Sequence, residues 1–241
     1  MTRRTLISLG FLFVATVVDM YPQEHLDWRY RVSADGHYMN GNIRRWYANT
    51  RFTITASDRL LSISLAPSLL YGQSGKVVFD RDMLVTLSTQ LLPQDMFFGY
   101  AVTTYDFSRR NKIESRWQSG AGAGMNTLQL PEHGLSITHA LVYENTRFNV
   151  VEGNETWRLS VRLKGFHQFF DRAVIFNHET YFQPSIERFS DLRWRTTVSL
   201  DFPITRALSF RTAIDKNHES VVLTGRKQDD LRWTFGVSVG N

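Results

Sequence analysis

Hydrophobic and polar residues alternate along most of the chain after Tyr30. In residues 192–202 (LRWRTTVSLDF), every second residue from Leu192 onward is apolar except for one threonine, and the residues between them are polar or charged. Residues 231–240 repeat the pattern. An α-helix, with about 3.6 residues per turn, would spread such residues around its whole surface, whereas a β-strand sorts them onto two opposite faces. The pattern therefore predicts β-strands.

About twelve alternating runs occur, and ten is the alternative count. The strands are expected near residues 30–40, 45–56, 60–71, 82–91, 96–107, 112–125, 135–143, 157–169, 173–183, 192–202, 207–217 and 231–240. Most of these runs hold ten to twelve residues. A tilted β-strand that crosses a bilayer needs roughly nine to eleven residues, whereas strands in soluble proteins average only about five to six. The lengths favour membrane-spanning strands.

The links between the runs alternate between short and long. Tight turns are expected at 57–59, 92–95, 170–172 and 203–206, and longer polar links at 72–81, 144–156, 185–191 and 218–230. Short turns at one end and long loops at the other are typical of an outer-membrane β-barrel, whose short turns face the periplasm. Two links depart from this rule, because 126–134 is long where a short turn is expected and 41–43 is short where a loop is expected.

Aromatic residues gather near the ends of the expected strands, as they do in the two interfacial girdles of membrane barrels. They are Trp28, Tyr30, Trp46, Phe97, Phe107, Tyr143, Trp157, Phe169, Trp194, Phe202 and Trp233. We therefore predict an all-β, closed antiparallel transmembrane barrel, with apolar faces toward lipid and polar faces toward the lumen. A secreted β-sandwich or a lipocalin-like barrel is the alternative, in which the apolar faces would be internal.

The N-terminus carries a predicted export signal. In residues 1–20, Arg3 and Arg4 precede an apolar run from Leu6 to Val18, which is the pattern of a secretory signal peptide. The run is shorter than the roughly 20 apolar residues of a membrane-spanning helix. A buried N-terminal helix or a membrane anchor is the alternative. The barrel domain is expected over residues 21–241, in the outer membrane of a Gram-negative bacterium.

The amino-acid composition excludes several other classes of protein. The chain has 241 residues, of which 42% are hydrophobic and 13% aromatic, so it is not globally disordered. It contains no cysteine, which excludes disulfides, thiolate metal sites and a cysteine nucleophile. The net charge of +5 is too small to indicate a nucleic-acid partner.

The polar faces of the expected strands carry many charged residues. The residues predicted to line the lumen are Arg51, Arg116, Arg158, Arg162, Lys164, Glu179, Arg193, Arg195, Asp201, Arg211, Asp215 and Arg232; Arg29, Arg31, Asp35, Lys112 and Glu114 are expected on the same face. One interpretation is an anion-selective passage or a site for phosphate-bearing ligands, because arginine grips phosphate with two hydrogen bonds. The preferred interpretation is an internal ion-pair network that closes a narrow barrel, since unpaired buried charges are costly.

The chain shows no recognisable catalytic motif. Ser136 and His139 are close in sequence, but an odd offset along a strand places them on opposite faces, so they cannot act as nucleophile and base. Neither G-x-S-x-G nor H-E-x-x-H occurs. We expect no catalytic residue, no metal and no cofactor.

Three glycines at alternate positions, Gly120, Gly122 and Gly124, resemble a phosphate-binding loop only superficially, because no Lys-Ser/Thr pair follows them. We expect them to make room for large lumenal side chains or to let the barrel bend.

The segment DFSRRNKIESRWQSGAGAGM (106–125) resembles a strand–turn–strand unit of the domain-of-unknown-function 481 family, which is described as salt-stress-induced outer-membrane proteins. Residues 191–217 are similar to another hairpin of that family, and Asp230 matches its ending. The resemblance covers residues 45–241 and implies a small outer-membrane β-barrel without known catalytic residues. We predict a passive role for the protein, as a narrow channel or as a structural, envelope-stress-related component, in contact with outer-membrane lipid and lipopolysaccharide.

Two further functions remain as alternatives. The barrel could be a subunit that binds a protein or a polysaccharide through the loops 144–156 and 218–230, or an outer-membrane lipid hydrolase.

Overall fold

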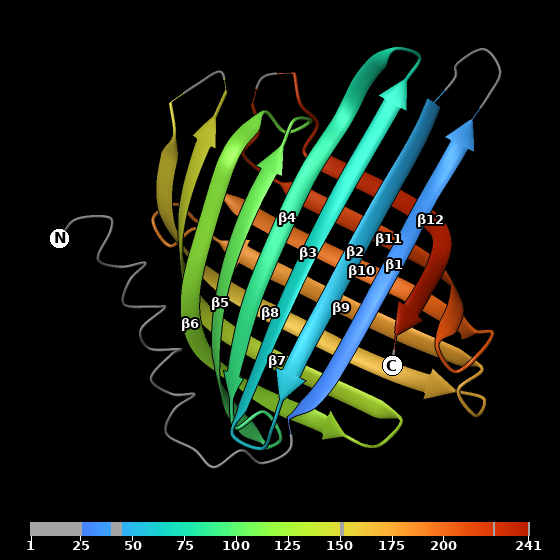
Figure 1. Ribbon diagram of the computed structural model, residues 1–241. Coiled ribbons are helices and arrows are strands. Elements are labelled where there is room, and N and C mark those ends of the chain that lie inside the picture. Colours follow the sequence, from blue (N-terminus) through green and yellow to red (C-terminus); the bar gives the residue numbers. More distant parts are fainter. Residues whose placement is uncertain (1–25, 40–44, 150–151, 224, 241) are drawn as a thin grey trace.

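In the computed structural model, the described residues form twelve β-strands that close into one antiparallel barrel (Figure 1). The structure describes residues 26–39, 45–149, 152–223 and 225–240. The predicted signal peptide and the link 41–43 lie outside these ranges. No helix long and apolar enough to span a bilayer occurs among the residues described. The predicted fold class and the preferred count of twelve strands are confirmed.

Each strand matches one of the predicted alternating runs. The strands are β1 (Asp27–Met39), β2 (Arg45–Ser57), β3 (Leu61–Ser74), β4 (Val77–Leu91), β5 (Phe97–Ser108), β6 (Ile113–Gln129), β7 (His133–Phe148), β8 (Asn154–Phe169), β9 (Val174–Pro184), β10 (Leu192–Pro203), β11 (Leu208–Glu219) and β12 (Asp229–Gly240).

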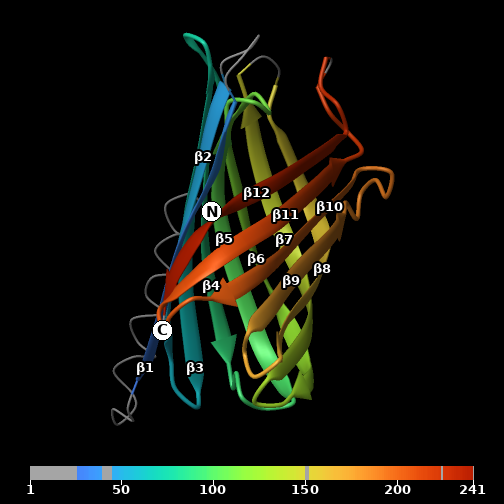
Figure 2. The same cartoon turned by 90° about the vertical axis from the view of Figure 1, so that its right-hand side faces the viewer.

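Each strand pairs with its neighbours in the sequence, and β12 pairs with β1 to complete the barrel. In Figure 1, strands β1–β6 lie on the near side and β8–β12 cross behind them at a large angle, which the turned view of Figure 2 also shows. Closure gives every strand two partners. Among the described strands none is left as an open edge, which is the condition for a β-sheet to exist in a bilayer.

The two ends of the barrel differ in their connections. One end, named the turn end, carries the connections 58–60, 92–96, 130–132, 170–173 and 204–207, and β1 begins and β12 ends there. The opposite end, named the loop end, carries 75–76, 109–112, 149–153, 185–191 and 220–228. The predicted alternation of turns with loops therefore holds in part, because two connections of the loop end are also short.

Several predicted links are shorter in the structure. The expected loop 72–81 is a two-residue turn at Gly75 and Lys76, and the link 126–134 shrinks to a three-residue turn because β6 continues to Gln129. The loop expected at 144–156 shrinks to 149–153 and that at 218–230 to 220–228. The sequence indicated loops because the alternation of apolar and polar residues is interrupted in these segments. They nevertheless pair as strands, and the inner face of 144–148 is buried at Glu144 and Thr146.

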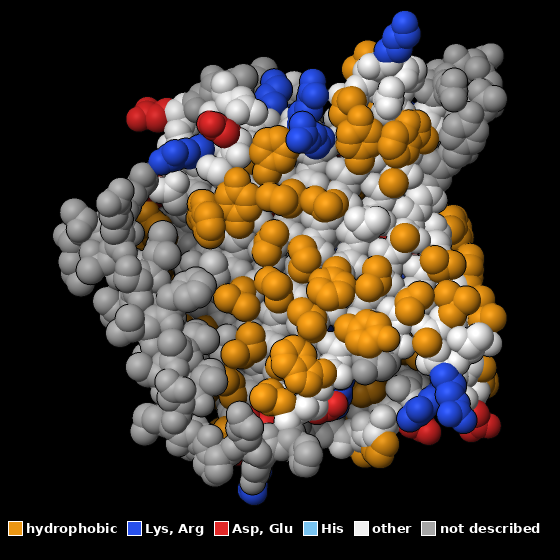
Figure 3. Space-filling model, viewed as in Figure 1, with side chains coloured by type: hydrophobic (Ala, Val, Ile, Leu, Met, Phe, Trp, Pro, Cys, Tyr) orange, Lys and Arg blue, Asp and Glu red, His pale blue; other side chains and the backbone are white. Residues whose placement is uncertain are grey.

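The outer face carries a continuous apolar surface. Figure 3 shows apolar side chains across the middle of the near side, with most charged side chains near its upper and lower margins. Exposed apolar residues of this band include Val32, Phe52, Leu65, Leu87, Leu141, Leu159, Ile214 and Val237. An apolar surface of this extent on a closed barrel matches the acyl chains of a bilayer.

Inside the barrel, a small apolar cluster covers the glycine-rich segment. Phe98 lies opposite Gly124 in the register, and Val142 lies opposite Gly120. A β-carbon at Gly124 would collide with the Phe98 ring. Phe98, Tyr100, Ala140 and Val142 pack together as a buried group. The prediction that the glycines make room for large lumenal side chains is confirmed at Gly124 and Gly120, whereas at Gly122 an added β-carbon would collide with the backbone of β7.

A charged side chain on the outer face should destabilise the barrel at mid-height but not at the turn end. We expect Leu141→Arg to lower the free energy of unfolding in lipid vesicles by about 2–4 kcal/mol, the range for an arginine at the bilayer midplane. Leu130→Arg, which alters an exposed leucine in a turn, should change it by less than about 1 kcal/mol. The measurement is equilibrium urea unfolding followed by tryptophan fluorescence. Equal effects of the two substitutions would mean that the outer face meets water.

Candidate functional site

The structure places all twelve residues predicted for the lumen on the inner face of β2, β6 and β8–β12. Their contacts show the direction of the side chains, because ion pairs join strands that are not neighbours in the sheet. Arg51 on β2 contacts Asp215 on β11 at 3.8 Å, and Arg193 on β10 contacts Glu144 on β7 at 2.5 Å. Such contacts can form only through the interior of the barrel.

Glu144 is the centre of a buried group near the loop end. Its carboxylate accepts a hydrogen bond from Arg158 Nε at 3.1 Å and another from Arg193 Nη1 at 2.5 Å. Arg116 Nε lies 4.0 Å from the same carboxylate. Arg158 also donates from Nη2 to both carboxylate oxygens of Asp191, each at 3.1 Å. The side chains of Glu144 and Arg158 are fully buried, so the two charges depend on each other.

The same group extends to β5 and β11. Arg116 Nη1 lies 3.4 Å from Asp106 and 3.3 Å from Glu219, and Arg226 of the 220–228 loop also contacts Glu219 at 3.4 Å. Together these contacts tie β5, β6, β7, β8, β10 and β11 to one another across the interior. This part of the interior is therefore crossed by ion pairs between strands that are not neighbours in the sheet.

A second loop-end group lies around Arg232 and Arg110. Arg232 Nη2 is 3.8 Å from Asp82 on β4. Arg110 lies 3.5 Å from Asp80 and 3.2 Å from Asp230. The pairs Arg232–Asp82 and Arg110–Asp230 join β12 to the opposite strands.

A third group surrounds Asp201, nearer to the turn end. Arg211 Nη1 donates to both of its carboxylate oxygens at 3.1 Å, and Arg31 Nη1 donates at 3.2 Å. Ser238 and Asn177 add hydrogen bonds of 3.0 and 2.9 Å. The Asp201 side chain is only 1% exposed, whereas that of Arg31 is 44% exposed. The carboxylate is buried behind the arginine.

Asp215, in the middle of β11, repeats this arrangement. Thr197 donates a 2.6 Å hydrogen bond to it, and Arg195 and Arg51 lie at 3.5 and 3.8 Å. The Asp215 side chain is 6% exposed, whereas Arg195 is 38% and Arg51 is 24% exposed. Here too the guanidinium groups face the open space and the carboxylate does not.

The fourth group contains Arg162 and Glu179. Arg162 pairs with Glu179 at 2.5 Å and lies over the rings of Tyr100 and Tyr181, with its guanidinium carbon 5.6 and 5.5 Å from their centroids. Lys164 follows on the same face of β8, opposite Glu179 in the register. Lys164 is exposed, and Glu179, at 33% side-chain exposure, is the more accessible partner of its ion pair.

The wall formed by β3 and β4 has a different chemistry. Five of their inward residues are small and hydroxylated, namely Ser62, Ser64, Ser68, Thr86 and Ser88, and Ser64 lies in register with both Thr55 and Ser88. Asp80 and Asp82 stand at the loop end of the same wall. The lumen therefore has a charged wall on β8–β12 and a hydroxyl-rich wall on β3–β4.

Two residues that the sequence placed in the lumen lie elsewhere. Lys112 is in the β5–β6 turn with a positive φ of 55°. Glu114 is the unpaired residue of a β-bulge between Ile113 and Ser115 and is exposed. The bulge shifts the alternation by one residue, so counting from the strand interior assigns Glu114 to the wrong face.

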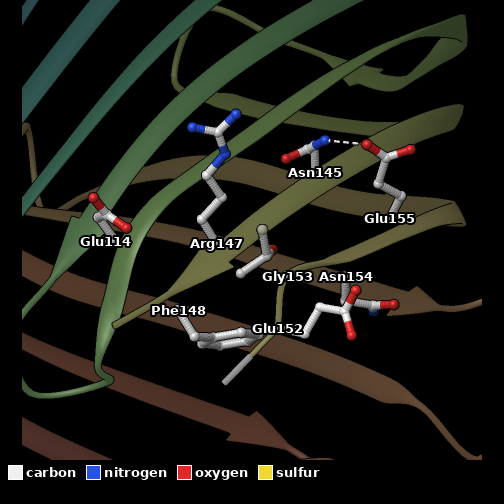
Figure 4. A pocket seen from close by; sticks show the side chains of 9 residues that line it. Glu114, Asn145, Arg147, Phe148, Glu152, Gly153, Asn154 and Glu155 are labelled. Carbon is white, nitrogen blue, oxygen red and sulfur yellow. Dashed lines mark hydrogen bonds between the residues drawn. The ribbon is translucent and has the colours of Figure 1, made fainter. Parts of the chain in front are cut away.

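A cavity of about 470 Å³ opens beside this bulge, and Figure 4 shows the side chains around it. Glu114, Arg147, Glu152 and Glu155 line it, and Asn145 donates a hydrogen bond to Glu155. The Arg147 guanidinium points away from the Glu152 carboxylate in Figure 4. No group of three or more side chains that could hold a metal ion occurs within the described ranges.

The structure also separates the residues considered for catalysis. Ser136 lies opposite Lys164 on the inner face, and His139 lies opposite Val161 on the outer face. Three other histidines, which the sequence did not bring together, meet on the outer face at the turn end. His167 lies between the other two, with its Nδ1 3.4 Å from Nδ1 of His133 and its Nε2 3.3 Å from Nε2 of His178.

Sequence reasoning missed Glu144, because it treated 144–156 as a loop. The signal was present, since Thr138, Ala140 and Val142 alternate with outward residues and Glu144 continues the same face. The charge of Glu144 suggested a solvent-exposed loop, whereas the three arginines around it allow it to be buried.

Comparisons with solved structures show the same fold at low sequence identity. The NanC porin has a TM-score of 0.55 and 10% identity over 87% of this chain and 98% of its own. An outer-membrane channel from Pseudomonas putida F1 has a TM-score of 0.51 and 8% identity over 92% of this chain and 97% of its own. At these identities the likeness shows the fold alone.

Sequence comparison gives a family but no characterised relative. No curated protein matches the chain. Residues 22–240 match the family described as "Protein of unknown function, DUF481", and this agrees with the resemblance noted from the segments 106–125 and 191–217. The match spans most of the sequence, and the chain therefore belongs to the DUF481 family.

Proposed function

We propose that this protein is a narrow, anion-selective channel of a Gram-negative outer membrane. The observation that carries the proposal is the unequal exposure of the two signs of charge around Asp201 and Asp215. The carboxylates of these two residues are buried, whereas Arg31, Arg195 and Lys164 are accessible. Glu179, whose side chain is 33% exposed, is the more accessible acid, so a solute in this part of the lumen would meet more positive than negative charge.

The outer-membrane location is supported by the barrel itself. Its apolar band faces outward, its strands leave no open edge, and the charged side chains face inward. In outer-membrane barrels the short turns and the termini face the periplasm, so the turn end would be periplasmic and the loop end extracellular. The similar solved structures are porins and channels, which supports a passive role over an enzymatic one.

Selectivity would arise from fixed positive charge in a space of low dielectric constant. Rings of arginine and lysine select anions in pores, and a cleft of one sign of charge raises the local concentration of the opposite ion. Arg195 and Arg31 are held in place by their buried carboxylate partners. The hydroxyl groups of β3 and β4 would offer hydrogen bonds on the opposite wall.

A structural barrel without a pore is the second candidate function. The ion pairs around Glu144 favour it, because Arg193 reaches Glu144 across the interior near the loop end and the Glu144 carboxylate is fully buried. A role in envelope stress would fit such a barrel, and it is suggested by the family resemblance alone. Docking of a partner through the loops is the least favoured function, because the connections 149–153 and 220–228 are shorter than the loops that the sequence predicted.

Channel activity can be measured directly in planar lipid bilayers under a gradient of potassium chloride. We expect the wild-type protein to conduct, with a reversal potential that shows preference for chloride. Replacing two accessible bases by acids, in the double variant Lys164→Glu/Arg195→Glu, should reduce the anion-to-cation permeability ratio by at least about threefold, because the fixed charge changes sign.

Lys216→Glu provides the matched control for this experiment. Lys216 lies on the outer face of β11 with its ammonium group 5.2 Å from the Trp194 ring centroid, so its replacement should leave the selectivity unchanged. Absence of conductance in correctly folded wild-type protein would favour the structural barrel. Equal changes of the permeability ratio in the two variants would show that the lumenal bases do not determine the selectivity.

Glu144→Gln should destabilise the barrel strongly. The substitution leaves Arg158 and Arg193 without the carboxylate that they share, and removal of one partner from a buried ion pair costs about 3–5 kcal/mol. Glu114→Gln removes a carboxylate from the same end, but that residue is exposed, so we expect a change below about 0.5 kcal/mol. Urea unfolding of both variants in the same detergent compares them. Similar stabilities would show that the Glu144 group does not hold the loop end together.

A further inference from the structure

Four basic side chains form a strip on the outside of the loop end. They are Arg81 on β4, Arg109 and Lys112 in the β5–β6 turn, and Arg147 on β7. All four are exposed, and none forms an ion pair with another residue in the described ranges. This distinguishes them from the lumenal arginines, whose charges are matched by buried carboxylates.

Backbone contacts place these residues side by side. Arg109 N donates to Arg81 O at 3.1 Å, and Lys112 N donates to Arg109 O at 3.1 Å. Asn149 N, two residues beyond Arg147, donates to Lys112 O at 3.0 Å. The strip therefore spans four adjacent strands, with the exposed Glu114 between Lys112 and Arg147. In Figure 3, Lys and Arg side chains are visible at the upper margin, above the apolar band.

Aromatic pairs lie directly below the strip on the same outer face. The rings of Tyr105 and Trp117 are 4.7 Å apart, and those of Tyr143 and Trp157 are 5.3 Å apart. Tyr143 is four residues before Arg147 on β7 and shares its face, so the two lie roughly 13 Å apart along the strand. Tyrosine and tryptophan mark the interface between acyl chains and headgroups. The basic strip lies just beyond that interface, at the height of lipid phosphates.

Resting on the proposed location in the outer membrane, we propose that this strip binds the phosphate groups of a phosphorylated glycolipid of the outer leaflet, namely lipopolysaccharide. Guanidinium groups bind phosphate through charge-assisted, bidentate hydrogen bonds. The aromatic pairs and the apolar band below offer the surface for its acyl chains. A free anion would have no reason to prefer this site, because these side chains lie outside the barrel and beside lipid.

Three acidic residues lie near the strip. Glu114 is exposed on β6, and Glu152 and Glu155 line the cavity beside Arg147. They lie on the β7 side of the strip, whereas Arg81 and Arg109 are on the β4–β5 side. The β4–β5 side is therefore expected to contribute most of the phosphate binding.

The test compares two variants that each lose three positive charges. The strip variant is Arg81→Gln/Arg109→Gln/Arg147→Gln. The control variant is Arg59→Gln/Arg172→Gln/Arg206→Gln, which alters exposed arginines in the connections of the turn end. Native mass spectrometry of the full chain in detergent, titrated with purified lipopolysaccharide, measures binding. We expect the strip variant to bind at least about tenfold more weakly, because each basic residue near an anionic lipid surface adds to the attraction. The control should bind as the wild type does.

Three results would overturn the proposal. They are equal binding by the strip variant and the wild type, equal loss in the control variant, and undiminished binding of enzymatically dephosphorylated lipopolysaccharide. Tighter binding of phosphatidylglycerol than of lipopolysaccharide would assign the strip to a phospholipid instead and would also contradict it. A heat-modifiability gel checks that each variant is folded.

Conductance in bilayers of pure phospholipid separates this proposal from the proposed channel function. The strip variant should conduct as the wild type does, because the altered side chains lie outside the lumen. If the protein is not a channel, neither the wild type nor the strip variant will conduct, and the two will still differ in lipopolysaccharide binding.

Discussion

The pairing of β1 with β12 is the constraint on which the rest of the structure depends. A β-sheet in lipid has no water with which to satisfy free backbone groups, so its edges must be paired with each other. Once the sheet is closed, each strand has one face inside and one outside. The alternation of apolar and polar residues then separates lipid contacts from lumenal contacts, and nothing in the sequence has to specify the two environments separately.

Closure also explains why so many charges can be enclosed. In the interior, arginines from one wall reach carboxylates on non-neighbouring strands, as Arg51 reaches Asp215 and Arg193 reaches Glu144. Toward the loop end these pairs are largely buried and tie the walls of the barrel together. Around Asp201 and Asp215 the carboxylates are buried and Arg31 and Arg195 are accessible, whereas in the Arg162–Glu179 pair the carboxylate is the more exposed partner. One set of ion pairs therefore has two physical effects, rigidity at the loop end and positive potential in the interior.

The sequence predicted the strands because their alternation lasts as long as one face meets lipid. It failed at strand ends such as 72–81, where the consecutive apolar residues Val77, Val78 and Phe79 among polar residues and glycines interrupt the alternation. Strand parity placed residues such as Arg158 and Asp201 on the inner face without further information. The partners of these residues could not be predicted, because they depend on which strands face each other across the interior. Glu144 was not predicted as a lumenal residue, because its segment was interpreted as a loop and its arginine partners could not be foreseen. Glu114 was assigned to the wrong face because a β-bulge shifts the alternation.

The sharing of single carboxylates among several guanidinium groups limits how the lumen can change during evolution. Asp201 holds Arg211 and Arg31, and Glu144 holds Arg158 and Arg193. Loss of either acid removes a partner from two bases at once, so a single substitution of one arginine would still leave the other without that partner. Natural variation at these positions should therefore be correlated, with whole groups replaced together, whereas the hydroxyl-rich wall of β3 and β4 is free to drift residue by residue.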